Sequence, residues 1–156
     1  MPQSSPVLRV QAIRNVHTFV AAQPSPITIV PGHGAIFKAS GSSSTFSALI
    51  DYLTTLQSKA TEAVVAGMNL THANVHLQMP SYSGYSLYPW VQNSINGPFA
   101  FVEAGGKIAA GETCGQVCWP PQGNGPHHSN ACSFCASGQC DDTLGPDAFW
   151  VMGQCV

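Results

Sequence analysis

Regularly spaced apolar residues mark the first segment of the chain as helical. Three- and four-residue intervals separate Val10, Ile13, His17 and Val20. Such intervals place side chains on one face of an α-helix. A Ser-Pro pair precedes the pattern and two prolines follow it, which is typical of a helix start and a helix end. The pattern predicts a helix over residues 6–22.

The strongest periodicity lies further along the chain. One apolar stripe is formed by Phe46, Leu49, Ile50, Leu53, Leu56, Ala60, Ala63 and Val64. It predicts a long amphipathic helix over residues 44–66. Gly67 would end this helix in the left-handed conformation. Two shorter helices are predicted over residues 71–77 and 87–95.

A short β-branched run lies between the two long helices. Residues 27–30 read Ile-Thr-Ile-Val, which is typical of a buried strand. The run leads directly into Pro31-Gly32-His33-Gly34, a sequence typical of a tight loop. We therefore expect one buried strand that ends in a histidine-bearing loop.

Cysteine usage divides the chain into two parts. Residues 1–104 contain no cysteine, and all six cysteines lie in residues 105–156. The glycine- and alanine-rich segment 105–111 reads as a linker between them. We therefore expect a first segment over 1–104 and a loop-rich, cysteine-rich tail over 105–156.

The low content of charged residues narrows the classes of binding partner that the chain could have. Charged residues make up 8% of the chain and the formal net charge is -2, whereas typical soluble domains contain roughly 25% charged residues. So few lysines and arginines cannot replace many phosphate counterions or attract an anionic lipid surface. No apolar run reaches the length of a transmembrane helix. We therefore expect neither nucleic acid nor membrane as a partner.

The order of these features resembles a known family. A helix, a short strand, a Pro-Gly-His-Gly loop and a long amphipathic helix resemble the C-terminal part of the metallo-β-lactamase superfamily, in particular its glyoxalase II-like and lactonase-like zinc hydrolases. Further matches lie at residues 52–56, 67–70 and 80–90, so the resemblance covers about residues 6–104. It implies an α/β fold, here a partial metallo-β-lactamase-like layered sandwich followed by the cysteine tail.

The resemblance also implies a chemistry. His33 occupies the position of a family zinc ligand, and zinc would activate water to hydrolyse an ester, lactone, thioester or similar bond of a small molecule. The upstream H-x-H-x-D-H motif that supplies most of the family's ligands is absent from this sequence. Activity is therefore expected only where the site is completed, and whether this chain is an enzyme stays open. His72 and His76, four residues apart, are expected to be exposed helix histidines and not ligands.

The six cysteines allow two structures for the tail. Three disulfides would suit an even number of cysteines in a segment rich in glycine and proline, with the pairing left open. Alternatively Cys114, Cys118, Cys132 and Cys135, taken together with His127 or His128, would supply the ligands of a tetrahedral zinc site. The spacing of the first pair and the two extra cysteines favour disulfides. With either a disulfide-linked or a zinc-binding tail, a second functional hypothesis is a non-catalytic interaction or scaffold protein.

Association and location complete the expectations. If the resemblance holds, the stripe and the strand lack the half-domain against which they would pack, which predicts a homo-oligomer or a missing N-terminal half. No signal-peptide pattern is visible at the N-terminus, while the cysteine tail would suit an oxidising compartment, so the location is left open. Asn69-Leu70-Thr71 is an N-glycosylation sequon, meaningful only in a secreted chain.

Overall fold

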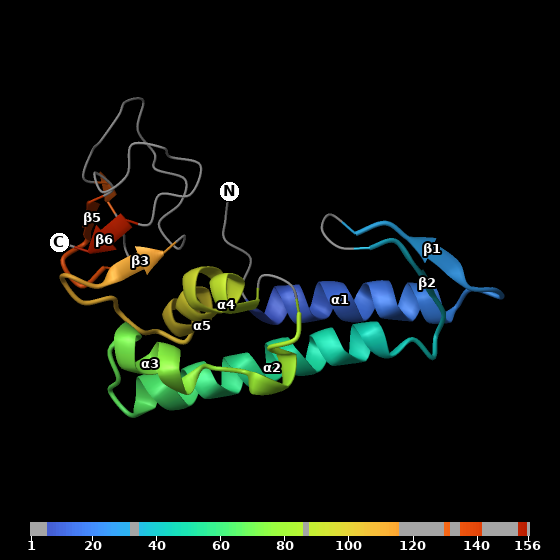
Figure 1. The fold of residues 1–156 in the computed structure, drawn as a ribbon, viewed down its shortest axis with the longest axis horizontal. Coiled ribbons are helices and arrows are strands. Elements are labelled where there is room, and N and C mark those ends of the chain that lie inside the picture. The colour runs from blue at the N-terminus through green and yellow to red at the C-terminus, as the bar shows by residue number, and fades with distance from the viewer. Residues whose placement is uncertain are drawn as a thin grey trace. The chain divides into compact units, whose positions relative to one another are not determined.

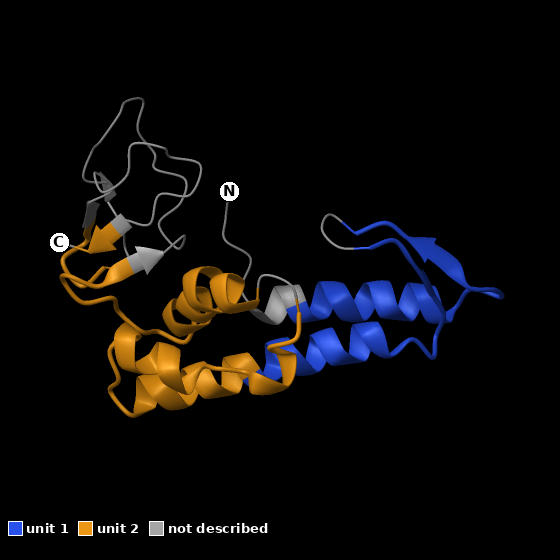
Figure 2. Ribbon diagram, viewed as in Figure 1, with its two compact units in different colours: residues 1–55 blue, residues 56–156 orange. Residues whose placement is uncertain are grey.

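The computed structural model describes residues 6–31, 35–85, 88–115, 130–131, 135–141 and 153–155. The chain forms two compact units, Met1–Thr55 (unit 1) and Leu56–Val156 (unit 2), which are coloured separately in Figure 2. The division expected from cysteine usage, between residues 104 and 105, is a different one and stays a prediction.

Unit 1 combines helices with one small hairpin. Its elements are α1 (Pro6–Ala21), β1 (Ile27–Ile29), β2 (Phe37–Ala39) and the first part of α2 (Ser44–Val65) (Figure 1). The two strands pair antiparallel, with Ile27 opposite Ala39 and Ile29 opposite Phe37. Both long helices lie where the apolar periodicity predicted them, within one residue at each end.

A small apolar core holds unit 1 together. Val20 of α1, Ala39 of β2 and Phe46 of α2 are buried against one another, and the partly buried residues packed on them are Ile13, Ile27, Ile29 and Phe37. The His17 ring stacks on Phe46 with 5.6 Å between ring centroids, and its Nε2 lies 3.3 Å from the carbonyl oxygen of Gly41. Each element of the unit therefore contributes at least one side chain to the same core.

Unit 2 is a set of helices followed by short strands. After the second part of α2 come α3 (Leu70–His76), the 3-10 turn η1 (Pro80–Tyr82), α4 (Tyr88–Val91), the π-helical turn η2 (Gln92–Asn96) and α5 (Gly97–Glu103). Gly67 ends α2 with φ of 69°, as predicted, and Met68 N–H donates to the Ala63 carbonyl at 3.0 Å. The largest buried side chains of this unit include Leu77, Phe101 and Ile108.

The cysteine tail contributes a small antiparallel sheet to unit 2. Its strands are β3 (Thr113–Gly115), β4 (Asn130–Ala131), β5 (Gln139–Asp141) and β6 (Gly153–Cys155), in the order β3-β6-β5-β4. Ile108 forms an isolated parallel bridge with Cys135 beside this sheet. The tail is therefore not made of loops alone in its described parts.

The expected layered α/β sandwich is wrong. In the described ranges the chain is mostly helical, and β1 pairs only with β2 in a two-stranded hairpin, so the described strands form no layered β-sandwich. The run at residues 27–30 is not a buried central strand either, because Thr28 is exposed and Val30 is 72% exposed. A β-branched run reports a preference for extended backbone, but a sheet needs further strands, and helices take up most of the first 104 residues.

The long apolar stripe is buried only in part. Phe46, Leu56, Ala60 and Ala63 are buried, whereas Leu49 is 42% exposed, and the association expected from this stripe stays a prediction. Among the residues that the structure describes, no helix is both long and apolar enough to cross a membrane.

Candidate functional site

The histidine loop falls outside the part of the chain that can be described. Pro31 and Ala35 bound the gap, and His33 lies within it. The role of His33 as a zinc ligand, and the hydrolase that this role implies, therefore stay predictions from the sequence.

Among the described residues, His72 and His76 of α3 are not part of a larger group of metal-ligating side chains. His72 is exposed at the start of α3, whereas His76 is half-buried at its end. His76 Nε2 lies 3.4 Å from Glu62 Oε2 without hydrogen-bond geometry, and the two form an ion pair only when the imidazole is protonated. Within the described ranges, no three His, Cys, Asp or Glu side chains are grouped closely enough to hold a metal ion.

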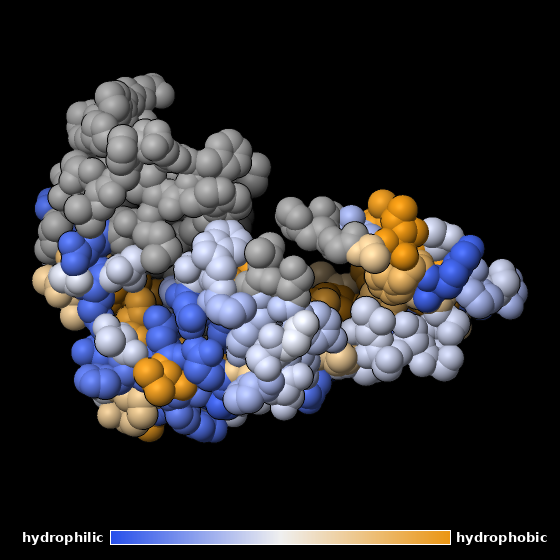
Figure 3. All heavy atoms as spheres, viewed as in Figure 1, coloured by the Kyte–Doolittle hydropathy of each residue, from blue (hydrophilic) through white to orange (hydrophobic). Residues whose placement is uncertain are grey.

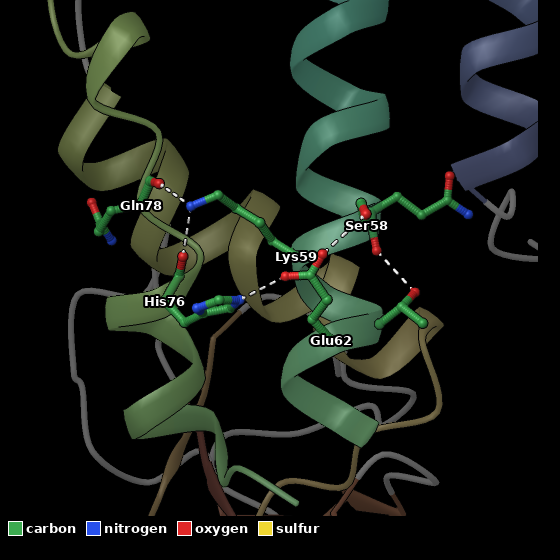
Figure 4. A network of polar contacts seen from close by, with 7 residues as sticks. Ser58, Lys59, Glu62, His76 and Gln78 are labelled. Carbon is green, nitrogen blue, oxygen red and sulfur yellow. Dashed lines mark hydrogen bonds and ion pairs between the residues drawn. The ribbon is translucent and has the colours of Figure 1, made fainter. Parts of the chain in front are cut away.

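The C-terminal end of α3 is held by a lysine. Lys59 of α2 is half-buried, and its Nζ donates to the carbonyl oxygens of His76 at 2.9 Å and Gln78 at 3.0 Å (Figure 4). These carbonyls lie at the helix terminus, where backbone acceptors lack partners and a positive charge is favoured. Lys59 therefore ties the end of α3 to α2.

A carboxylate holds the opposite end of the same helix. Glu112 Oε1 accepts hydrogen bonds from the Thr71 backbone N–H and from the Thr71 hydroxyl, each at 2.7 Å. Glu112 Oε2 accepts from the backbone N–H groups of Ala109 at 3.0 Å and Leu70 at 3.3 Å. The first N–H groups of a helix have no acceptors within the helix. This carboxylate, which comes from a distant segment, supplies the missing acceptors and a favourable negative charge.

The hydrogen bonds to Glu112 control its protonation. Burial raises the pKa of the Glu112 carboxyl, but the hydrogen bonds from Thr71, Ala109 and Leu70 favour the charged form more strongly, so its pKa lies below the ordinary value of 4.5. Because the folded-state pKa is depressed, the ionised carboxylate stabilises the fold. That contribution is fully present above the pKa of the unfolded chain and is lost as the pH falls through the folded-state value.

Replacing this carboxylate gives a measurable prediction. We expect Glu112→Gln to lower the free energy of unfolding at pH 7 by about 1–3 kcal/mol, since hydrogen bonds to a charged acceptor are replaced by weaker ones. The difference from the parent should shrink as the pH falls below 4.5. Urea unfolding of both chains between pH 7 and pH 3 measures it.

Glu62→Gln is the matched control for that measurement. Glu62 is a carboxylate of the same unit that is 62% exposed, so its loss should change stability by roughly 0.5 kcal/mol or less. A Glu112→Gln chain as stable as the parent at pH 7 would show that the carboxylate does not clamp α3.

The tail is joined to the Glu112 segment by backbone bonds and a disulfide. Gly111 N–H donates to the Cys155 carbonyl at 2.7 Å, and Cys155 N–H donates to the Glu112 carbonyl at 2.9 Å. Ala136 N–H donates to the Ile108 carbonyl at 2.8 Å. Cys135 and Cys155 are linked by a disulfide and are 2% and 1% exposed. The segment around Glu112 is thereby fixed to α3 on one side and to the tail on the other.

The cysteine alternatives can be compared with this geometry only in part. For Cys135 the structure follows the disulfide alternative, with Cys155 as its partner. The side chain of Cys114 and the whole of Cys118 and Cys132 lie outside the described residues, as do His127 and His128. The four-cysteine zinc site therefore stays a prediction.

Two of the residues that organise this region were not singled out from the sequence. Glu112 is the only acidic residue between Glu103 and Asp141, which is the one signal that could have drawn attention to it. Lys59 reads as an ordinary polar position of an amphipathic helix. Both act as structural ties in the described geometry.

Comparison with models of known protein families, with curated proteins and with solved structures finds no match for this chain.

Proposed function

We propose that the protein is a self-associating interaction or scaffold protein. The observation that carries this proposal is the exposure of large apolar side chains on unit 1. The exposed fractions are 46% for Val16, 61% for Phe19, 72% for Val30 and 65% for Ile36. These four residues are called the apolar surface of unit 1 below.

The physical reason is the cost of keeping these side chains in water. Fully burying a Val, Ile or Phe side chain gains about 1.5–3 kcal/mol. Two of the four residues, Val30 and Ile36, lie next to the ends of the hairpin strands, and Figure 3 shows hydrophobic colouring over the hairpin. Contact with a second copy of the chain would remove them from water.

Two further features favour association. The hairpin forms a two-stranded sheet of β1 and β2 in the described chain, so each strand has an outer edge able to pair with another chain. Only 8% of the residues are charged and the net charge is -2, which gives little repulsion between copies. The second copy of the chain is therefore the partner that we propose.

The rigid scaffold in this proposal is the part of unit 2 in which α3 and the tail are joined. The buried disulfide and the three hydrogen bonds from α3 to Glu112 hold the tail and α3 as one body. A body fixed in this way keeps its surface in one conformation, which lowers the entropic cost of binding a partner.

Sedimentation or light scattering at micromolar concentration tests the proposal. We expect a dimer or larger oligomer for the parent chain and a shift to monomer for the triple variant Phe19→Gln, Val30→Thr, Ile36→Thr. These side chains are exposed, so the substitutions should change the stability of unit 1 by roughly 0.5 kcal/mol per site or less.

Val75→Gln is the matched control. Val75 is 76% exposed and lies on α3 of unit 2, so this variant removes an equally exposed apolar side chain away from the apolar surface of unit 1. It should associate like the parent. A parent chain that is monodisperse and monomeric at micromolar concentration would contradict the proposal.

A further inference from the structure

We infer that Asn69 carries an N-linked oligosaccharide, added before Glu112 closes over the neighbouring Thr71. Asn69-Leu70-Thr71 is the only Asn-x-Ser/Thr sequence without proline at x in the chain. Four observations on the residues around it carry the inference, and none of them depends on the proposed self-association.

The first observation is the accessibility of the site. Asn69 is exposed and lies in the turn between α2 and α3. Gly67 in the same turn is exposed too, and a Cβ placed on it would meet no described atom within 4 Å. A turn that faces open space has room for a bulky, hydrated group.

The second observation is how Asn69 uses its side chain. Asn69 is the N-cap of α3, and its Oδ1 accepts a hydrogen bond from His72 N–H at 3.0 Å. An oligosaccharide is attached through the other atom of the carboxamide, Nδ2. The glycan and the helix cap therefore use different atoms, and the modified residue can still cap α3.

The third observation concerns the compartment. The buried disulfide between Cys135 and Cys155 requires an oxidising environment to form and persist. Asparagine-linked glycosylation takes place in the same kind of environment, the lumen of the secretory pathway. Glycosylation of the sequon and formation of the disulfide therefore require the same kind of compartment.

The fourth observation sets the order of events. The Thr71 hydroxyl, which defines the sequon, donates to Glu112 Oε1 at 2.7 Å in the folded chain. Glu112 lies 41 residues after Thr71, so the sequon emerges during synthesis well before its clamp exists. The hydroxyl is therefore available to the transferase early and is occupied once the tail has docked.

The transfer itself is a simple displacement. Asn69 Nδ2 forms a bond to the anomeric carbon of an oligosaccharide carried on a lipid pyrophosphate. The bond between that carbon and the pyrophosphate oxygen breaks, the lipid pyrophosphate leaves, and the amide nitrogen loses one proton. Nothing is oxidised or reduced.

Two measurements on the full chain test for the glycan. The chain isolated from the cells that make it should lose mass on treatment with peptide N-glycosidase, and peptide mass mapping should place the modification at Asn69. In a secretory expression host, Asn69→Gln and Thr71→Ala should lose the glycan, whereas the matched variant Thr71→Ser should keep it. An isolated chain without a glycan at Asn69, or an Asn69→Gln chain that keeps it, overturns the inference.

A third measurement tests the order of events. The oxidised, folded chain and the reduced, unfolded chain are each given purified oligosaccharyltransferase and a lipid-linked oligosaccharide. We expect transfer to the unfolded chain and loss of transfer to the folded chain. Equal transfer to both would show that the Glu112 clamp does not close the sequon.

Discussion

Phe101→Ala is expected to lower the free energy of unfolding by about 3–5 kcal/mol, which is the usual cost of removing a buried phenylalanine ring. Phe101 lies in α5, is 1% exposed and is among the largest fully buried side chains. Its ring lies so close to Gly106 that a Cβ placed there would come within 2.4 Å of the ring. Truncation would therefore leave a cavity beside a backbone segment that the ring now fills.

Urea unfolding followed by circular dichroism measures this change. Tyr85→Ala is the matched control, because Tyr85 is an aromatic residue of the same unit that is 66% exposed, and its loss should cost roughly 0.5 kcal/mol or less. Gly106→Ala should destabilise the chain as well, because the added Cβ would clash with the Phe101 ring. A Phe101→Ala chain that unfolds at the same urea concentration as the Tyr85→Ala chain would contradict this account of the core.

Local signals explain which parts of the fold could be predicted. The stripe from Phe46 to Val64 and the left-handed Gly67 depend on neighbours a few residues away, so periodicity and capping rules were enough for α2. The helix α5 was not predicted, although Pro98 suits the first turn of a helix and the residues after it are buried. Gly97-Pro98 reads as a turn when only its neighbours are considered.

Long-range partners explain the failures. The run at residues 27–30 predicts a buried strand, but its only strand partner in the described chain is β2. Phe37–Ala39 carries a central lysine and gave no strand signal of its own. A sheet depends on strands that are distant in sequence, and a β-branched run alone does not reveal how many exist.

The candidate site was the least predictable part for the same reason. Glu112 meets Thr71 across 41 residues, and Lys59 meets Gln78 across 19. His72 and His76 lie near the start and at the end of α3, where the described ranges contain no metal-binding cluster. Polar contacts of this kind join residues that are distant in sequence, so the spacing of residues along the chain does not reveal them.

The disulfide gives the second large expected effect. We expect the double variant Cys135→Ala, Cys155→Ala to lower the free energy of unfolding by about 3 kcal/mol, the value for closing a loop of this order of length. The two cysteines are 20 residues apart in sequence and both are buried. Without the bond, the unfolded chain gains conformational freedom, and the backbone at position 155 is no longer fixed next to Gly111 and Glu112.

Comparison of the parent and the double variant under the same oxidising conditions measures this loss, because a reductant could also act on the other four cysteines. Ala136→Ser, at an exposed position next to Cys135, is the control and should change stability by roughly 0.5 kcal/mol or less. The double variant should also expose the backbone amides of Gly111 and Cys155 to faster hydrogen exchange, since each donates a hydrogen bond across this junction. If stability and exchange at these amides both stay at the parental level, the disulfide does not hold the tail on the Glu112 segment.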